Sequence, residues 1–148
     1  MSIRPATKHF GPNEGRAFKV GRFDVSLKAD TRDGSGYTIA EITIPPGLGP
    51  SPHHHPFEES IYILEGDFEL HGADGARYRG GPGCAVHAPP NAVHGFRNVG
   101  DSTGRLLLVG HVENESFLEE MSVAMAKTPR DEELIASVFA RHGIVEEE

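Results

Sequence analysis

The chain has 148 residues, of which 37% are hydrophobic, and a formal net charge of −8 at pH 7. That length suits one domain with one hydrophobic core, and the acidic charge argues against nucleic acids and anionic membranes as partners. Cys84 is the only cysteine, so no disulfide can form within the chain. No apolar run approaches the roughly 20 residues of a transmembrane helix, and the N-terminus lacks the apolar stretch of a secretory signal. A cytoplasmic location is therefore expected.

Residues 1–17 show no hydrophobic period and are predicted to form an N-terminal arm. A strand-rich domain is predicted over residues 18–112. Its first two apolar alternations lie at 23–29 and 40–44, and each predicts a strand with one face on a core and the other in water.

Further short strands are predicted along the rest of this domain. With 18 glycines and 11 prolines the chain is rich in turns, and Asp74-Gly75 is a strong hairpin signal. Many short strands between turns predict an all-β fold, a small barrel or sandwich. The expected strand segments are SIYILEG (60–66), FELHG (68–72), ARYRG (76–80), CAVHA (84–88), VHGFRN (93–98) and RLLLVGHV (105–112).

The hydrophobic period changes to a helical one in residues 113–148, which predicts two C-terminal α-helices that pack on the β domain. Ser116-x-x-Glu119 predicts a capping box at the start of the first helix. Thr128 is the expected N-cap of the second helix, with Pro129 in its first position. Gly143 is expected to end that helix as a left-handed C-cap.

Three side chains that can bind a metal share one parity after the second strand. If the segment is extended, His53, His55 and Glu59 point to the same side, and His54 points away. A neighbouring strand can supply a fourth ligand, for which His94 is the best candidate. Imidazole and carboxylate together suit one divalent transition metal, namely Fe, Ni, Mn, Zn, Cu or Co. The alternative is a solvated loop rich in proline and histidine.

Two spaced motifs carry a resemblance to a known family. They read Gly47-x5-His53-x-His55-x3-Glu59-x6-Gly66 and Gly83-x5-Pro89-x-Asn91-x2-His94-x3-Asn98. Together they resemble the two signature motifs of the cupin superfamily.

The resemblance implies a small jelly-roll β-barrel, the double-stranded β-helix of cupins, with a metal on three histidines and one glutamate. Carried over, the ligands are His53, His55, Glu59 and His94. Asn91 departs from the family's glycine, but asparagine tolerates the positive φ of such a turn.

The C-terminal segment is also similar to the helical extension of single-domain bacterial cupins, some of which are labelled quercetin-dioxygenase-like. The family resemblance further implies a homodimer. Strands before residue 45 are the expected partners, because an unpaired sheet edge invites pairing.

Two residues are predicted to bind a small-molecule substrate inside the barrel. His87 shares its parity with Ala85 and Pro89, and Phe96 shares its parity with His94. For His87 the alternative is a half-buried histidine whose hydrogen bonds are met by a neighbouring strand. Phe96 is expected to shape the pocket.

Three functions are compatible with these residues. The first is a metal-dependent dioxygenase that acts on a small organic substrate, aromatic or polyketide-like, with Glu59 as an additional catalytic base. The second is a redox-neutral isomerase or cyclase that uses the metal as a Lewis acid. The third is a binding module without turnover. The sequence favours them in that order.

Overall fold

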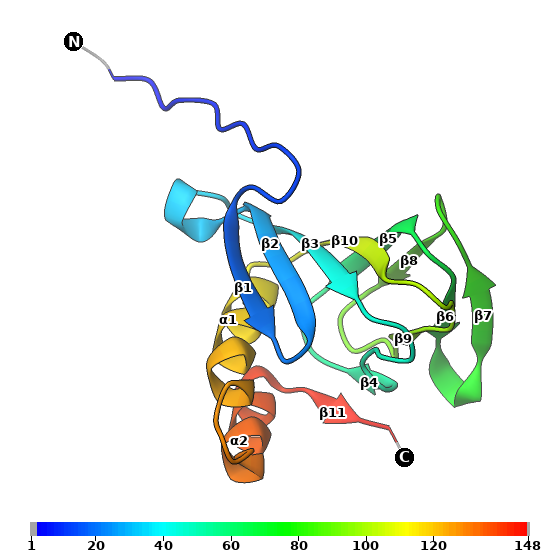
Figure 1. Ribbon diagram of the computed structural model, residues 1–148. Coiled ribbons are helices and arrows are strands. Elements are labelled where there is room, and N and C mark those ends of the chain that lie inside the picture. Colours follow the sequence, from blue (N-terminus) through cyan, green and yellow to red (C-terminus); the bar gives the residue numbers. More distant parts are fainter. Residues whose placement is uncertain (1–2, 148) are drawn as a thin grey trace.

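The computed structural model describes residues 3–147, so Met1, Ser2 and Glu148, at the ends of the predicted arm and helical extension, lie outside it. Figure 1 shows the strands gathered in one body, with residues 3–10 exposed and extending away from it. The strands are β1 (Arg16–Val20), β2 (Phe23–Ala29), β3 (Thr38–Ile44), β4 (His53–His54), β5 (Glu59–Glu65), β6 (Phe68–His71), β7 (Arg77–Gly80), β8 (Ala85–Ala88), β9 (Gly95–Asn98), β10 (Gly104–Gly110) and β11 (Val145–Glu146). The helices are α1 (Glu113–Met125) and α2 (Glu132–His142).

The strands form the expected jelly roll. One sheet has the order β1-β2-β3-β10-β5-β8, a second has the order β7-β6-β9, and β11 pairs with β4. A backbone bridge between His53 and His94 joins β4 to the segment before β9. The largest fully buried apolar side chains, which come from both sheets, are Phe68, Leu27, Ile44, Ile63 and Leu106.

Period-two alternation of burial holds in β3 and β5 but not in the short strands β7 and β9. Burial alternates residue by residue along β3, from Thr38 to Ile44. The β6–β7 hairpin turns at Asp74 and Gly75, whose φ angles are 58° and 75°. The hairpin prediction is therefore confirmed, with the left-handed conformations that such a turn needs.

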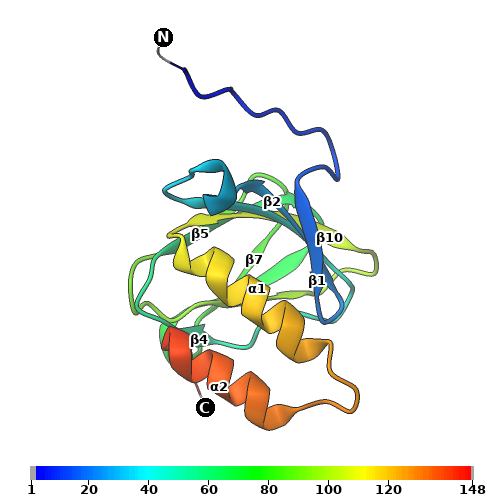
Figure 2. The same cartoon turned by 90° about the vertical axis from the view of Figure 1, so that its left-hand side faces the viewer.

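The helices cover one side of the strands (Figure 2), but both begin elsewhere than predicted. The capping box is wrong: α1 begins at Glu113, so Ser116 already lies in its first turn, and the Glu119 carboxylate pairs with Arg16 instead. The predicted N-cap of the second helix is also wrong. Helix α2 begins after Thr128 and Pro129, and its N-cap is Asp131, whose side chain accepts a 3.0 Å hydrogen bond from the Leu134 amide.

The end of α2 is as predicted. Gly143 has a φ of 68° and caps the helix in the left-handed conformation. Beyond it the chain forms β11, which the sequence did not predict. The Glu147 amide extends this pairing with a 2.9 Å hydrogen bond to the Pro52 carbonyl.

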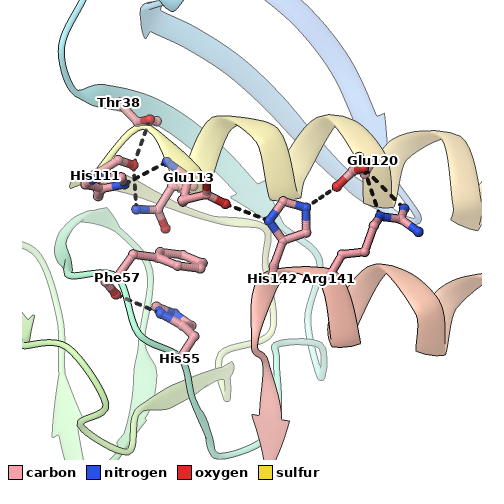
Figure 3. A network of polar contacts seen from close by, with 9 residues as sticks. Thr38, His55, Phe57, His111, Glu113, Glu120, Arg141 and His142 are labelled. Atoms are coloured by element: carbon pink, nitrogen blue, oxygen red, sulfur yellow. Dashed lines mark hydrogen bonds and ion pairs between the residues drawn. The ribbon is translucent and has the colours of Figure 1, made fainter.

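Helix α1 is attached through two sets of charged side chains. Glu115 and Glu119 pair with Arg16 of β1, and Glu115 also accepts hydrogen bonds from the amide and hydroxyl of Thr31. On another side of α1, Glu113 and Glu120 hold the buried His142 of α2 between them, as Figure 3 shows. The first set ties α1 to the β domain, and the second ties α2 to α1.

Among residues 3–147, neither helix combines the length and the apolar character needed to cross a bilayer.

Candidate metal centre

The segment that carries the candidate ligands is interrupted, yet its alternation persists. β4 ends at His54 and β5 begins only at Glu59, with a bend between them. Across this bend His55, Phe57 and Glu59 are buried, whereas Pro56 and Glu58 are exposed. The parity inferred from the sequence therefore survives without a continuous strand, and the side chains still converge on the interior.

Backbone carbonyls fix the orientation of all three imidazoles. The Nδ1 atom of His53 lies 2.7 Å from the Ser51 carbonyl, that of His55 2.8 Å from the Phe57 carbonyl, and that of His94 2.8 Å from the Ala92 carbonyl. A carbonyl can only accept, so each Nδ1 carries a proton, and in the neutral imidazole Nε2 is the atom with the free lone pair. This is the tautomer in which a histidine binds a metal through Nε2.

The candidate ligand atoms of His53, His55, Glu59 and His94 lie within 4.8 Å of one another. Glu59 Oε1 is 2.5 Å from His94 Nε2 and 3.8 Å from His55 Nε2. Despite that proximity, the buried His94 Nε2 has no partner with hydrogen-bond geometry in the described chain. This geometry is expected if Glu59 Oε1 and His94 Nε2 are both directed at a shared point between them and not at each other.

The electrostatics of the group favour a cation. Burial and the neighbouring His94 lower the pKa of His53 to about 4, so it is a neutral ligand near pH 7. Burial alone raises the pKa of Glu59, but the imidazoles of His55 and His94 outweigh it and lower that pKa to about 2. Burial lowers the pKa of His94, yet the adjacent Glu59 carboxylate reverses the shift and raises it. The interior thus holds an ionised carboxylate beside the neutral His53 and a His94 whose positive form that carboxylate stabilises.

These observations fit a divalent transition metal. Three nitrogen donors and one oxygen donor are typical of first-row metal sites. The orphaned Nε2 and the buried anion are both groups that such an ion would satisfy. Zinc, iron, nickel, manganese, copper and cobalt all accept this set of donors.

A cavity of about 750 Å³ opens from this cluster, and His53, His55 and Glu59 line it. Most of the remaining lining is apolar and comes from both the β domain and the helices. The volume lies within the range of small-molecule sites. The cluster therefore faces a space that can admit an organic ligand.

The two predicted substrate-binding residues lie in different places. Phe96 is buried and lines the cavity. His87 does not line it: the residue is exposed on the outer face of β8, where Nδ1 lies 2.9 Å from Ser60 Oγ. β8 pairs with β5 so that Ala88 lies opposite Glu59, which turns Ala88 inward and His87 outward. The prediction that His87 faces the interior of the barrel is therefore wrong, because the residues of its parity in β8 lie on the outer face.

Several cavity residues were not anticipated. Asn114 is buried at the start of α1, lines the cavity, and donates hydrogen bonds to the carbonyls of Glu58 and His111. Phe117, Met121 and Phe139 line the helical side. The helical spacing around Met121 and Phe139 was visible in the sequence, but it indicated only a face that packs on the β domain, not one that borders a cavity; Phe117 was not part of that pattern.

The model of the Cupin domain family matches residues 40–110. A polyketide synthase, CurC, from Streptomyces cyaneus is 33% identical over 82 residues, which cover 48% of this chain and 53% of that protein. The match thus spans about half the length of that curated relative.

The structure of the polyketide cyclase RemF from Streptomyces resistomycificus is similar to that of this chain. It has a TM-score of 0.64 at 29% identity, and the match covers 72% of this chain and 80% of RemF. KdgF from Halomonas sp. has a TM-score of 0.62 at 21% identity, covering 74% and 99%, a likeness of fold alone.

These matches support the cupin assignment made from the two motifs. The quercetin-dioxygenase-like subtype, by contrast, stays a prediction.

Proposed function

We propose that this cupin-fold protein is a metal-dependent enzyme that cyclises a polyketide-like substrate without net oxidation. One observation carries the proposal: oriented imidazoles and a buried carboxylate converge at one end of a mostly apolar cavity. The likeness to a polyketide cyclase and a polyketide synthase supports the choice of substrate class. It also favours the redox-neutral function over the dioxygenase that the sequence placed first.

In this proposal His53, His55, Glu59 and His94 hold the metal. A bound divalent ion would supply Lewis-acid polarisation of a substrate carbonyl. The ionised Glu59 offsets part of its charge, and the carbonyl-anchored imidazoles keep the ligand atoms fixed. Apolar walls exclude water, which strengthens electrostatic interactions inside the cavity.

The chemistry needs no oxidant. When an activated CH₂ group attacks a ketone in the same chain, a carbon–carbon and an oxygen–hydrogen bond form while a carbon–hydrogen bond and the carbonyl π bond break. The proton lost from carbon ends on the former ketone oxygen. A base must accept that proton on the way. The catalytic role of Glu59 as a base stays a prediction, and a pKa of about 2 makes it a weak proton acceptor near neutral pH.

The test is a comparison of turnover in nitrogen and in air. Protein purified without chelators is incubated with a linear poly-β-ketone, and products are followed by mass spectrometry. We expect the same product in both atmospheres, with a mass unchanged or lower by one water, and its loss in His94→Ala. A product that forms only in air and gains oxygen would support the dioxygenase instead. Binding without any product would support the non-catalytic alternative.

The homodimer and the cytoplasmic location also stay predictions. Strand β1 forms one edge of its sheet, so it is available to pair with a second copy of the chain. The molecular mass in solution tests this pairing. A monomer at micromolar concentration would contradict the homodimer.

A further inference from the structure

Both helices line the cavity over several turns, opposite residues of the β domain. Along α1 its lining runs from Asn114 to Met125, and along α2 from Glu132 to Ala140. At 1.5 Å per residue the α1 stretch alone spans roughly 16 Å. Asn114 touches the Glu58 carbonyl beside the metal cluster, so the cavity extends from that cluster along the helices toward the α1–α2 loop.

The helical wall is apolar but incompletely packed. Phe117, Leu118, Met125 and Phe139 line the cavity and are only half-buried, although they are large. Large apolar side chains that surround a hollow are typical of a surface awaiting an apolar ligand. At the far end Arg130 and Glu132 pair with each other at 2.5 Å, so their charges compensate there.

Charged contacts on other sides of α1 hold this wall in place. Glu115 and Glu119 bind Arg16 of the β domain, and Glu113 and Glu120 bind His142. The cavity-facing side chains also pack against the core, so these charged contacts are a second attachment of the helices. A change at one exposed position of the wall can therefore alter the cavity while the helices stay attached.

From these features we infer that the α1–α2 pair selects the substrate by the size of its carbon skeleton. The substrate class is an elongated molecule with an oxygen-bearing head at the metal cluster and a body of two or more fused rings, or the equivalent folded chain, against Phe117, Met121 and Phe139. This inference rests on the proposed function. The wall lies beyond residue 110, where the match to the Cupin domain model ends.

The experiment measures binding of three hydroxyaryl ketones that share one head and differ in ring number. The probes are 2-hydroxyacetophenone, 1-hydroxy-2-acetonaphthone and 1-hydroxyanthraquinone, titrated into protein purified without chelators. Each added ring buries more apolar surface, so we expect affinity to rise by about tenfold per ring.

Matched variants locate the effect. Ala136 lines the cavity and is exposed on α2, so Ala136→Phe narrows the hollow without entering the core. It should weaken the three-ring probe by at least about tenfold and the one-ring probe by less than about twofold. Val123, which is 63% exposed and absent from the lining, provides the control Val123→Phe, which should change neither.

Metal content is measured for every variant and should not change. Equal affinities for all three probes, or an equal loss for all three in Ala136→Phe, would overturn the inference while leaving the proposed function intact. If ring-dependent binding persists but the protein neither holds metal nor cyclises its substrate, the proposed function fails alone.

Discussion

The two ends of the cavity are built in opposite ways. At the β end, polar side chains are held individually, each imidazole by a carbonyl two residues away. At the helical end, large apolar side chains border the cavity and pack as a group against the core, while charged contacts lie on other sides of α1. A rigid polar end suits chemistry, which tolerates little displacement, whereas an apolar wall can change in size. The difference implies that metal binding and helix attachment can be broken separately.

Removing a ligand should give the largest effect. In His94→Ala we expect metal affinity to fall by more than about a hundredfold, beyond the 10- to 100-fold loss that follows removal of a supporting residue. Metal per chain is measured by elemental analysis after purification without chelators. His87→Ala is the matched control, because His87 is exposed on the outer face of β8. Retention of metal by His94→Ala, or its loss from His87→Ala, would contradict the site.

Breaking the attachment of α1 should cost stability but not metal. Glu115 is buried and accepts hydrogen bonds from the Thr31 amide and hydroxyl while pairing with Arg16. In Glu115→Ala those donors lose their acceptor, so we expect the free energy of unfolding to fall by about 2–3 kcal/mol.

That loss is measured by urea unfolding of metal-free protein, since bound metal would shift the midpoint. The control is Glu133→Ala, at an exposed position of α2, which should stay within about 0.5 kcal/mol of the wild type. A loss below about 1 kcal/mol in Glu115→Ala would contradict the attachment role of Glu115. A loss of metal affinity comparable to that of His94→Ala would mean that the two ends are not independent.

The site was more predictable than the walls around it. The four candidate ligands could be grouped from the sequence because period-two alternation and motif spacing are local, and the alternation persists across the bend between β4 and β5. His87 was misplaced because its facing depends on the register between β8 and β5, which no short segment encodes. The alternation of residues along a strand separates its two faces, but it does not say which face points to the interior.

The helix starts failed for a related reason. Glu119 was read as half of a capping box, but its carboxylate pairs with Arg16, more than 100 positions away in the chain. Residues that compete for local and tertiary partners cannot be assigned from neighbours alone. Gly143 was correct because only backbone conformation decides a left-handed cap.

The attachment of β1 also predicts a pH dependence. Asp30 is buried beside Arg16, at 2.6 Å. Burial raises the pKa of Asp30, but Arg16 and the Arg32 amide outweigh it, and the pKa is lowered overall. A carboxyl with a lowered pKa stabilises the fold above its unfolded value of about 3.9 and loses that contribution as pH falls through the folded value.

Asp30→Asn keeps an acceptor for the Arg32 amide, which bonds Asp30 Oδ1 at 2.8 Å, but removes the charge. We expect it to lower the free energy of unfolding by about 1–2 kcal/mol at pH 7. The difference from the wild type should shrink below about pH 4. Urea unfolding at a series of pH values measures it, and a difference that grows on acidification would contradict the sign.

The smallest effect is expected at Asn91, where the chain departs from the cupin motif. Its φ is 67°, as the sequence predicted, and its amide donates a 2.7 Å hydrogen bond to the His55 carbonyl. A left-handed conformation costs alanine about 1 kcal/mol more than asparagine or glycine. Asn91→Ala should therefore lose about 1 kcal/mol in urea unfolding, whereas Asn91→Gly should match the wild type within about 0.5 kcal/mol. Asparagine, alanine and glycine all keep the backbone amide that bonds to the His55 carbonyl, so metal affinity should stay the same in both variants. A selective loss of metal in Asn91→Gly would show that the asparagine side chain itself supports the polar end of the cavity.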